Sequence, residues 1–225
     1  MPSLAASTSS ARSPRGDAIR NRLLDAAEKL FAERGIDAVS LNSIARFANQ
    51  LNSSVMQYHF GSKTGLIDAI LERRMVDLNR RRNELIADID TSDRATALHK
   101  VAEAMVLPFA EHLFIEGGSS YLRFTAQVTF NADKSVFDMA RGKHDSAVRK
   151  ISALVQEILS DMKPDLVRHR LALVTNLVLF GVGEREKLRM AGKNSGVARL
   201  HTDEFIKDLV QIIAAALSAP EAPAR

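Results

Sequence analysis

Residues 40–63 read SLNSIARFANQLNSSVMQYHFGSK, and this stretch decides the fold of the N-terminal part of the chain. Apolar residues recur at helical spacing on both sides of the polar pair Asn49-Gln50. The stretch therefore predicts two short helices joined by a tight polar turn. Ser40 can cap the first helix, and Asn52 or Ser53 the second, because short polar side chains accept hydrogen bonds from the free N–H groups at a helix start.

Residues 38–67 contain no Asp or Glu, although charged residues make up 26% of the chain, and the charges that remain, on Arg46 and Lys63, are positive. Carboxylates would repel phosphates, whereas amides and hydroxyls can contact both phosphates and base edges. This surface predicts binding in a DNA groove; the alternative is an ordinary helical corner with a polar surface. The expected contacts are Ser40, Asn42, Asn52, Ser53, Ser54, Gln57, Tyr58, His59 and Lys63.

Lys63 would stand in the first turn of a helix capped by Ser62, where the helix dipole disfavours a cation. A phosphate bound there would explain the placement, because the helix start and the ammonium would then act together. Ser40 is expected to contact phosphate as well as to cap its helix. The alternative for Lys63 is a solvated surface lysine.

Composition sets broad limits on the chain of 225 residues, of which 46% are hydrophobic. The net charge of +4 permits a nucleic-acid partner without demanding one, and the absence of Cys excludes disulfides and thiolate metal sites. The longest apolar run, at 171–182, is shorter than a bilayer-spanning helix requires. We therefore expect a soluble cytoplasmic protein with no membrane partner.

Strand signals are almost absent, so an all-α fold is predicted. Gly35 should end a first helix that starts near Asp17, and Ser62 should begin a long helix that ends near 90–92. The C-terminal part is expected to hold helices over 93–115, 119–131, 143–162, 165–190 and 202–218. The predicted divisions are a disordered arm over 1–16, a three-helix unit over 17–63, a connecting helix over 64–92, a larger helical domain over 93–219 and a disordered tail over 220–225.

Three segments resemble the N-terminal domain of tetracycline-repressor (TetR) family regulators: IRNRLLDAAEKLFAERGIDAVS at 19–40, SIARFA at 43–48 and QYHFGSKTGLIDAI at 57–70. The chain departs from the usual pattern in a turn that is one residue longer after Ala48 and in Gln57, which stands where most members have Tyr. The resemblance covers about residues 18–70. It implies a helix-turn-helix DNA-binding domain whose third helix enters a major groove, followed by a helical ligand-binding and dimerisation domain. The matching positions include Leu24, Ala26, Ala27, Leu30, Phe31, Ile44, Ala45 and Phe60.

Aromatic residues concentrate at 109–130, beside Pro108, which is expected to kink its helix. They form either plain core or a pocket between helices with a few polar groups. As a pocket they would bind a small apolar effector of unknown identity, and charged metabolites are less expected there. The predicted ligand-binding residues are Phe109, Leu113, Tyr121, Phe124, Thr125, Val128 and Asn176.

Residues 171–183 read LALVTNLVLFGVG, which is apolar around most of the circumference of a helix, and 205–217 carry a second apolar stripe. Two such helices meeting their symmetry mates would make a four-helix homodimer interface. The alternative is burial within one chain. The predicted interface residues are Leu171, Val174, Leu177, Val178, Phe205, Leu209 and Ile213.

These patterns together predict a dimeric transcriptional regulator, a repressor that binds palindromic double-stranded DNA and is released by its effector. One rival is a DNA-binding protein without an effector, which a filled core around Phe124 would favour. The other is a helical enzyme, but no nucleophile is grouped with a base. The six His lack metal-ligand spacing, so no metal and no cofactor are predicted.

Overall fold

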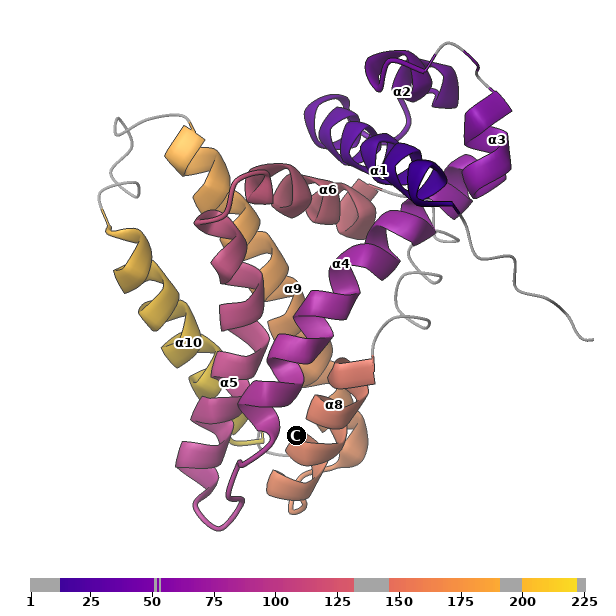
Figure 1. Cartoon of the computed structure of the whole chain (residues 1–225). Helices are drawn as coiled ribbons and strands as arrows, with labels where there is room; N and C mark the ends of the chain where they lie inside the picture. Colours follow the sequence, from indigo (N-terminus) through magenta and orange to yellow (C-terminus); the bar gives the residue numbers. More distant parts are fainter. Residues whose placement is uncertain (1–12, 51, 53, 132–145, 191–199, 222–225) are drawn as a thin grey trace, which may run out of the picture.

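The computed structural model describes residues 13–50, 52, 54–131, 146–190 and 200–221. Every regular element within these ranges is helical, which confirms the predicted all-α class. A small bundle forms one end of the molecule, and a long helix leads from it into a larger bundle (Figure 1). The small bundle consists of α1 (Pro14–Arg34), α2 (Leu41–Phe47) and α3 (Ser54–Phe60), and the long helix is α4 (Lys63–Ile86).

The first helix begins at Pro14, earlier than the predicted Asp17. The Ser13 hydroxyl accepts a hydrogen bond from the Gly16 N–H at 3.3 Å, and Pro suits the first position of a helix because its missing N–H would be unpaired there. The predicted disordered arm over 1–16 is therefore wrong for 14–16, while 1–12 lie outside the described residues. Gly35 ends α1 as predicted, with a positive φ of 84° that favours glycine.

The turn after α2 is closed by the backbone itself. The Gln50 N–H donates to the Ala45 carbonyl at 2.9 Å, and the Asn49 N–H donates to the Arg46 carbonyl at 3.0 Å. These two hydrogen bonds require the residue just after the helix to adopt the left-handed backbone conformation. Asn49 adopts it, with a φ of 56°. Asn49 and Gln50 thus form the predicted turn, because Asn tolerates the positive φ that the turn needs.

The long helix α4 starts where predicted, because the Ser62 hydroxyl accepts from the Gly65 N–H at 3.0 Å. It ends at Ile86 rather than near 90–92. The Asp90 carboxylate accepts from the Ser92 N–H at 2.9 Å, which closes a turn instead of continuing the helix. Asp93 then caps the next helix by accepting from the Thr96 N–H at 3.3 Å.

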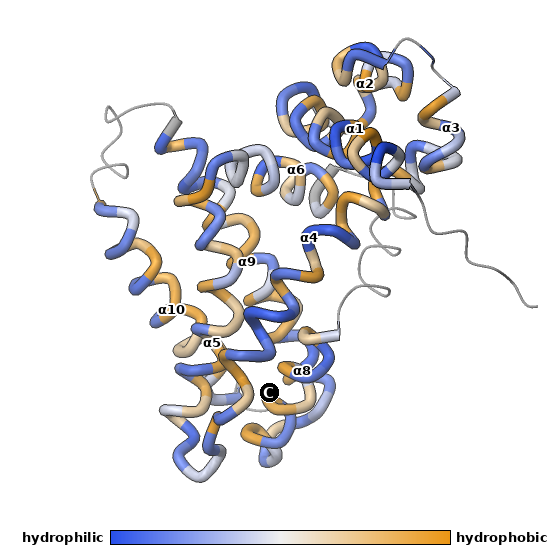
Figure 2. The backbone as a smooth tube through the Cα atoms, in the orientation of Figure 1, coloured by the Kyte–Doolittle hydropathy of each residue, from blue (hydrophilic) through white to orange (hydrophobic). Residues whose placement is uncertain are grey.

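The larger bundle contains α5 (Arg94–Ala110), the short 3₁₀ helix η1 (Glu111–Leu113), α6 (Gly118–Asn131), α8 (Ser146–Ile158), α9 (Pro164–Met190) and α10 (Thr202–Ser218). Helix α10 packs against α5 and α9, while α8 packs against α4, α5 and α9. Apolar positions run along the length of α5, α9 and α10, as expected of helices that share a core (Figure 2).

Two predicted helices are shorter in the structure. The helix expected over 93–115 ends at Ala110 and passes into the 3₁₀ turn η1 at Glu111. Pro108 lies inside the last turn of α5, as predicted, and the kink expected there stays a prediction. The helix expected over 143–162 ends at Ile158 and gives way to turns before Pro164; 143–145 lie outside the described residues.

Helix α9 is long and apolar enough, judged by length and composition alone, to cross a membrane. The apolar run at 171–182, expected to be too short to span a membrane, is the middle part of this longer helix. The core helix of a soluble protein passes the same test, and Val174, Val178 and Val182 of α9 are buried inside the protomer.

The junction between the two bundles is built from α1, α4 and α6. The rings of Phe31 in α1 and Phe124 in α6 stack with centroids 6.0 Å apart. Beside them Glu28, only 3% exposed, accepts two hydrogen bonds from the Arg74 guanidinium at 2.9 and 2.6 Å. Arg74 also lies over the ring of Tyr121, 5.1 Å from its centroid. A buried ion pair and two aromatic contacts thus hold the small bundle against the large one.

Replacing Glu28 with Ala should lower the free energy of unfolding by about 3 kcal/mol, because Arg74 would lose its carboxylate in a site largely closed to water. The control is Asp25→Ala, since Asp25 pairs with Arg73 at 2.7 Å but is 67% exposed. That pair should contribute less than about 1 kcal/mol. Urea unfolding at one fixed protein concentration measures both. Equal losses in the two variants would show that burial of Glu28 has no special role.

Candidate functional site

The exposed face of α3 carries Ser54, Gln57 and Tyr58, at positions i, i+3 and i+4 of one helix. Tyr58 is 81% exposed, although large aromatic side chains are normally covered. On the opposite side Met56 is 1% exposed and fixes α3 to the small bundle. The helix therefore exposes three polar side chains on the face opposite its core contact, and their role as a reading surface for DNA stays a prediction.

Two other predicted contacts act in helix capping. The Asn52 side-chain oxygen accepts from the Ser54 N–H at 3.0 Å and from the Ser54 hydroxyl at 2.7 Å. The Ser40 hydroxyl accepts from the Ser43 N–H at 3.1 Å. Both residues are exposed, so each can contact a partner while holding its cap. Asn42 is exposed on α2, and Ser53 lies outside the described residues.

His59 is half-buried between its neighbours rather than displayed with Tyr58. Its ring centroid lies 5.0 Å from that of Tyr58 and 5.9 Å from that of Phe60. Arg20 of α1 lies over the Phe60 ring at 5.5 Å and ties the end of α3 to the bundle. His59 thus supports the orientation of Tyr58, and a direct contact to a partner would involve only part of its ring.

Lys63 folds back onto the small bundle. Its ammonium donates to the Asp37 carbonyl at 3.3 Å and lies 6.0 Å from the centroid of the Phe31 ring. These contacts already compensate for a cation at a helix start, so the predicted phosphate is not needed to explain the placement. A phosphate contact by Lys63 stays a prediction, and it requires the ammonium to exchange the carbonyl for the phosphate.

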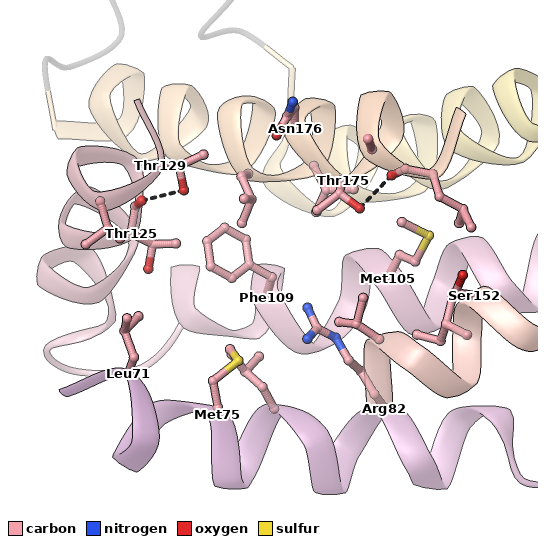
Figure 3. Close-up of a pocket in the computed structure, with 18 of the residues that line it drawn as sticks. Leu71, Met75, Arg82, Met105, Phe109, Thr125, Thr129, Ser152, Thr175 and Asn176 are labelled. Atoms are coloured by element: carbon pink, nitrogen blue, oxygen red, sulfur yellow. Dashed lines mark hydrogen bonds between the residues drawn. The ribbon is translucent and has the colours of Figure 1, made fainter. Parts of the chain in front are cut away.

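A cavity of about 390 Å³ lies inside the larger bundle, at the lower end of the range typical of small-molecule sites (Figure 3). Helices α4, α5, α6, α8 and α9 all contribute to its wall. The wall is mainly apolar, with a few hydroxyls, one amide and two arginines. Its residues are Leu71, Met75, Leu78, Arg82, Met105, Phe109, Tyr121, Thr125, Val128, Thr129, Val148, Ile151, Ser152, Arg168, Leu171, Ala172, Thr175, Asn176, Val178 and Leu179.

Five predicted ligand-binding residues line this cavity: Phe109, Tyr121, Thr125, Val128 and Asn176. The other two do not. Phe124 points to the junction, where it stacks on Phe31, and Leu113 is buried in η1, which packs on α5 and α6. Both are core residues, because neighbouring apolar residues on a helix point to different faces and only one face meets the cavity.

Sequence reasoning missed the contribution of α4, which it treated only as a connection. Leu71, Met75, Leu78 and Arg82 of α4 line the cavity and follow one another at helical spacing. That stripe continues past the small bundle, and this continuation was the signal that could have placed α4 in the wall. No comparable signal in the sequence marked the lining residues of α8 and α9. Residues that line a cavity and residues that pack in a filled core have the same apolar spacing on a helix.

Most polar groups of the wall are already engaged. The hydroxyls of Thr125, Thr129 and Thr175 donate to carbonyls one turn earlier, at 2.9, 2.8 and 2.7 Å, so each presents an acceptor oxygen only. Burial raises the pKa of Tyr121 to about 12, so its phenol is neutral near pH 7. Burial, and then the charge of Arg74, lower the pKa of the adjacent His112 to about 4, so that ring is neutral as well.

The predicted dimer residues divide between two faces. Val174, Val178, Leu209 and Ile213 are each at most 4% exposed within one protomer, so they belong to its own core, which corrects their assignment to the interface. Leu171 and Phe205 are half-buried. Leu177 is exposed, and with Leu173 and Phe180 it forms an outward stripe on α9 beside exposed Ile212 of α10. This outward stripe is one of the exposed apolar surfaces among the described residues, another being Phe114 and Ile115.

No group of three or more His, Asp or Glu suited to hold a metal occurs within the described ranges. The described residues also include an exposed polar helix face on α3 and a mainly apolar cavity in the larger bundle.

Comparisons with known proteins match both bundles. Residues 23–70 match the family described as bacterial regulatory proteins, tetR family, and residues 103–216 match the family described as tetracyclin repressor-like, C-terminal domain. The HTH-type transcriptional repressor KstR2 of Rhodococcus jostii (strain RHA1) is 41% identical over 68 residues, which are 30% of this chain and 33% of that protein. The chain thus matches about a third of the length of that relative.

Solved structures share the fold over almost the whole chain. NalD of Pseudomonas aeruginosa, a secondary repressor of the MexAB-OprM multidrug efflux pump, has a TM-score of 0.62 at 18% identity, covering 89% of this chain and 97% of its own. The regulator PfmR of Thermus thermophilus has 0.58 at 16%, covering 91% and 98%. A putative regulator of Saccharomonospora viridis, solved in complex with choline, has 0.56 at 18%, covering 88% and 96%. At these identities the likeness concerns the fold alone.

Proposed function

We propose that this chain, which belongs to the tetR family of bacterial regulatory proteins, is a dimeric repressor released from its operator when a small, largely apolar molecule fills the cavity. Proteins of the family are DNA-binding transcriptional regulators and not enzymes, and KstR2 and NalD are repressors. The protein would act in the cytoplasm, on palindromic double-stranded DNA.

The observation that carries the proposal is the dual role of α4. Its first turn, at Lys63, directly follows α3, while Leu71, Met75 and Leu78 further along line the cavity. A ligand can shift the reading surface only if it binds one position of α4 better than the other. The core around Phe124 is filled, which was the expectation for the effector-independent alternative. The cavity that supports an effector lies one turn later on α6, at Val128.

Replacing Gln57 or Tyr58 with Ala should weaken binding to the selected operator by about 1–3 kcal/mol if a base contact is lost. Neither residue is buried, so the fold should remain intact. Operator sequences are first selected from random duplex DNA with the wild-type chain, and affinities are then measured by fluorescence anisotropy. Gln211→Ala, an exposed amide on α10, is the matched control. Wild-type affinity in both α3 variants would refute the reading surface.

A Glu at Leu177 or Phe180 should convert the dimer into monomers, because an unpaired charge would be buried between two copies of the outward stripe. Sedimentation at micromolar concentration should give twice the chain mass of 24.7 kDa for the wild type. Val76→Glu is the control, since Val76 is apolar and 64% exposed on α4. A wild-type monomer, or variants that stay dimeric, would rule out this interface.

Val128→Trp should abolish the response to effector while operator affinity stays near that of the wild type, because Val128 lines the cavity and is not part of α3. Apolar compounds are first screened for stabilisation of the folded protein, which binding must produce by linkage. Hits are then tested for release of the operator. Val76→Trp controls for the new side chain, and Ser152→Phe fills the cavity from α8 should the first variant misfold. Stabilising hits that leave operator affinity unchanged would contradict effector control.

A further inference from the structure

The charges in the cavity wall are already engaged. Arg82 of α4 and Arg168 of α9 are the charged lining residues, and none of the described lining residues is Asp or Glu. Arg168 forms an ion pair with Asp165 on the surface of α9, and Arg82 has an interaction partner as well. A charged ligand would therefore lose its hydration without gaining an unpaired counter-ion, which is costly against a mainly apolar wall.

Two hydroxyls of the wall present acceptors rather than donors. Thr129 of α6 donates its proton to the Thr125 carbonyl at 2.8 Å, and Thr175 of α9 donates its proton to the Leu171 carbonyl at 2.7 Å. A hydroxyl oxygen can still accept after its proton has been donated. Within the described ranges no group donates to either oxygen, and both residues are half-buried in the cavity wall. Each oxygen is therefore able to accept a hydrogen bond from a ligand.

Thr125, the third Thr of the wall, is engaged with its neighbour Tyr121 instead. Its hydroxyl donates to the Tyr121 carbonyl at 2.9 Å, and its side chain also forms a hydrogen bond with the Tyr121 phenol. Both residues are buried. Because Thr125 and Tyr121 satisfy each other, the open acceptors among the Thr residues are those of Thr129 and Thr175.

Two further lining residues can donate. The Ser152 hydroxyl of α8 accepts from the Gln156 amide at 3.5 Å, so its own proton is available, and Asn176 is an exposed amide on α9. Ser152 is well separated from Thr129 in the close-up (Figure 3). A ligand acceptor would suit Ser152, and a ligand donor would suit Thr129 or Thr175. A hydroxyl group can both donate and accept, whereas a carbonyl can only accept.

We infer that the cavity takes an uncharged molecule with a hydrocarbon body and a hydroxyl that donates a hydrogen bond to the oxygen of Thr129 or Thr175. Apolar side chains such as Phe109, Val128 and Val178 bound the rest of the space and suit the hydrocarbon body. The inference rests on the proposed function for the location of the effector. It adds a required hydrogen-bond donor, which a purely apolar effector would lack.

The test uses four probes at each chain length from eight to twelve carbons: the secondary alcohol, the methyl ketone of the same skeleton, the carboxylate and the primary amine. Alcohol and ketone occupy nearly the same volume, and only the alcohol can donate. Isothermal titration calorimetry measures each below its solubility limit and micellar concentration. At the best chain length the alcohol should bind about fivefold more tightly than the ketone, the factor expected of one net hydrogen bond. The two charged probes should bind about tenfold more weakly than the alcohol, or less tightly still.

Replacing both Thr129 and Thr175 with Val should abolish the preference for the alcohol and leave ketone affinity within about twofold, because Val keeps the branched shape without the oxygen. The two single variants show which oxygen accepts the hydrogen bond, and at least one must lose the preference, so they carry the test should the double variant misfold. Thr96→Val is the matched control, since Thr96 is exposed in the first turn of α5 and does not line the cavity. Its preference should equal that of the wild type.

The inference is overturned if the ketone binds as well as the alcohol at every length, if a charged probe binds more tightly than the alcohol, or if the Val variants keep the wild-type preference. Operator release, measured with the same probes, separates this result from the proposed function. A ketone that binds as well as the alcohol and releases DNA would contradict the donor requirement and leave effector control standing. An alcohol that binds through Thr129 or Thr175 without releasing DNA would have the opposite meaning.

Discussion

The arrangement of this protein depends on one buried carboxylate. Glu28 lies on α1 at 3% exposure, and both of its oxygens accept from the Arg74 guanidinium. A buried charge is tolerated only when it is paired and hydrogen-bonded, so α1 and α4 are constrained to a narrow range of relative positions. The far side of Arg74 covers the Tyr121 ring, which extends the constraint to α6. The Arg74 side chain therefore contacts α1 of the small bundle and α6 of the larger one, and links both to α4.

This contact joins the two candidate sites. Tyr121 belongs to the cavity wall, and α1 carries the small bundle that displays α3. A ligand that pressed on the Tyr121 ring or on the cavity face of α4 would change the geometry of the Arg74–Glu28 pair. Because the cost of breaking a buried pair is large, the small bundle would move with α4 instead of separating from it. The aromatic stack of Phe31 on Phe124 reinforces this rigid coupling.

The sequence alone determined the small bundle almost completely, because its elements are set by contacts between near neighbours. Ser40, Ser62 and Gly35 begin or end their helices through hydrogen bonds to residues three or four positions away. Asn49 closes the turn through its own backbone conformation. Such local interactions act in the same way whatever surrounds them, so caps, turn and helix type could be predicted from residue types and spacing. The all-α class and the larger helical domain follow from the spacing of apolar residues, whereas the sequence left open whether that domain has a filled core or a pocket.

Only the tertiary structure decided which face of each apolar helix meets which neighbour. Val178 and Leu177 are adjacent in sequence and alike in chemistry, yet the first lies in the cavity wall and the second is exposed. Phe124 packs on α1 while Val128, one turn later, lines the cavity. Arg82 resembles the neighbouring surface arginines in sequence, and only the packing of α4 against α8 and α5 places it in the cavity wall. The physical reason is that hydrophobic burial is non-directional: it drives a side chain out of water without specifying the partner that covers it.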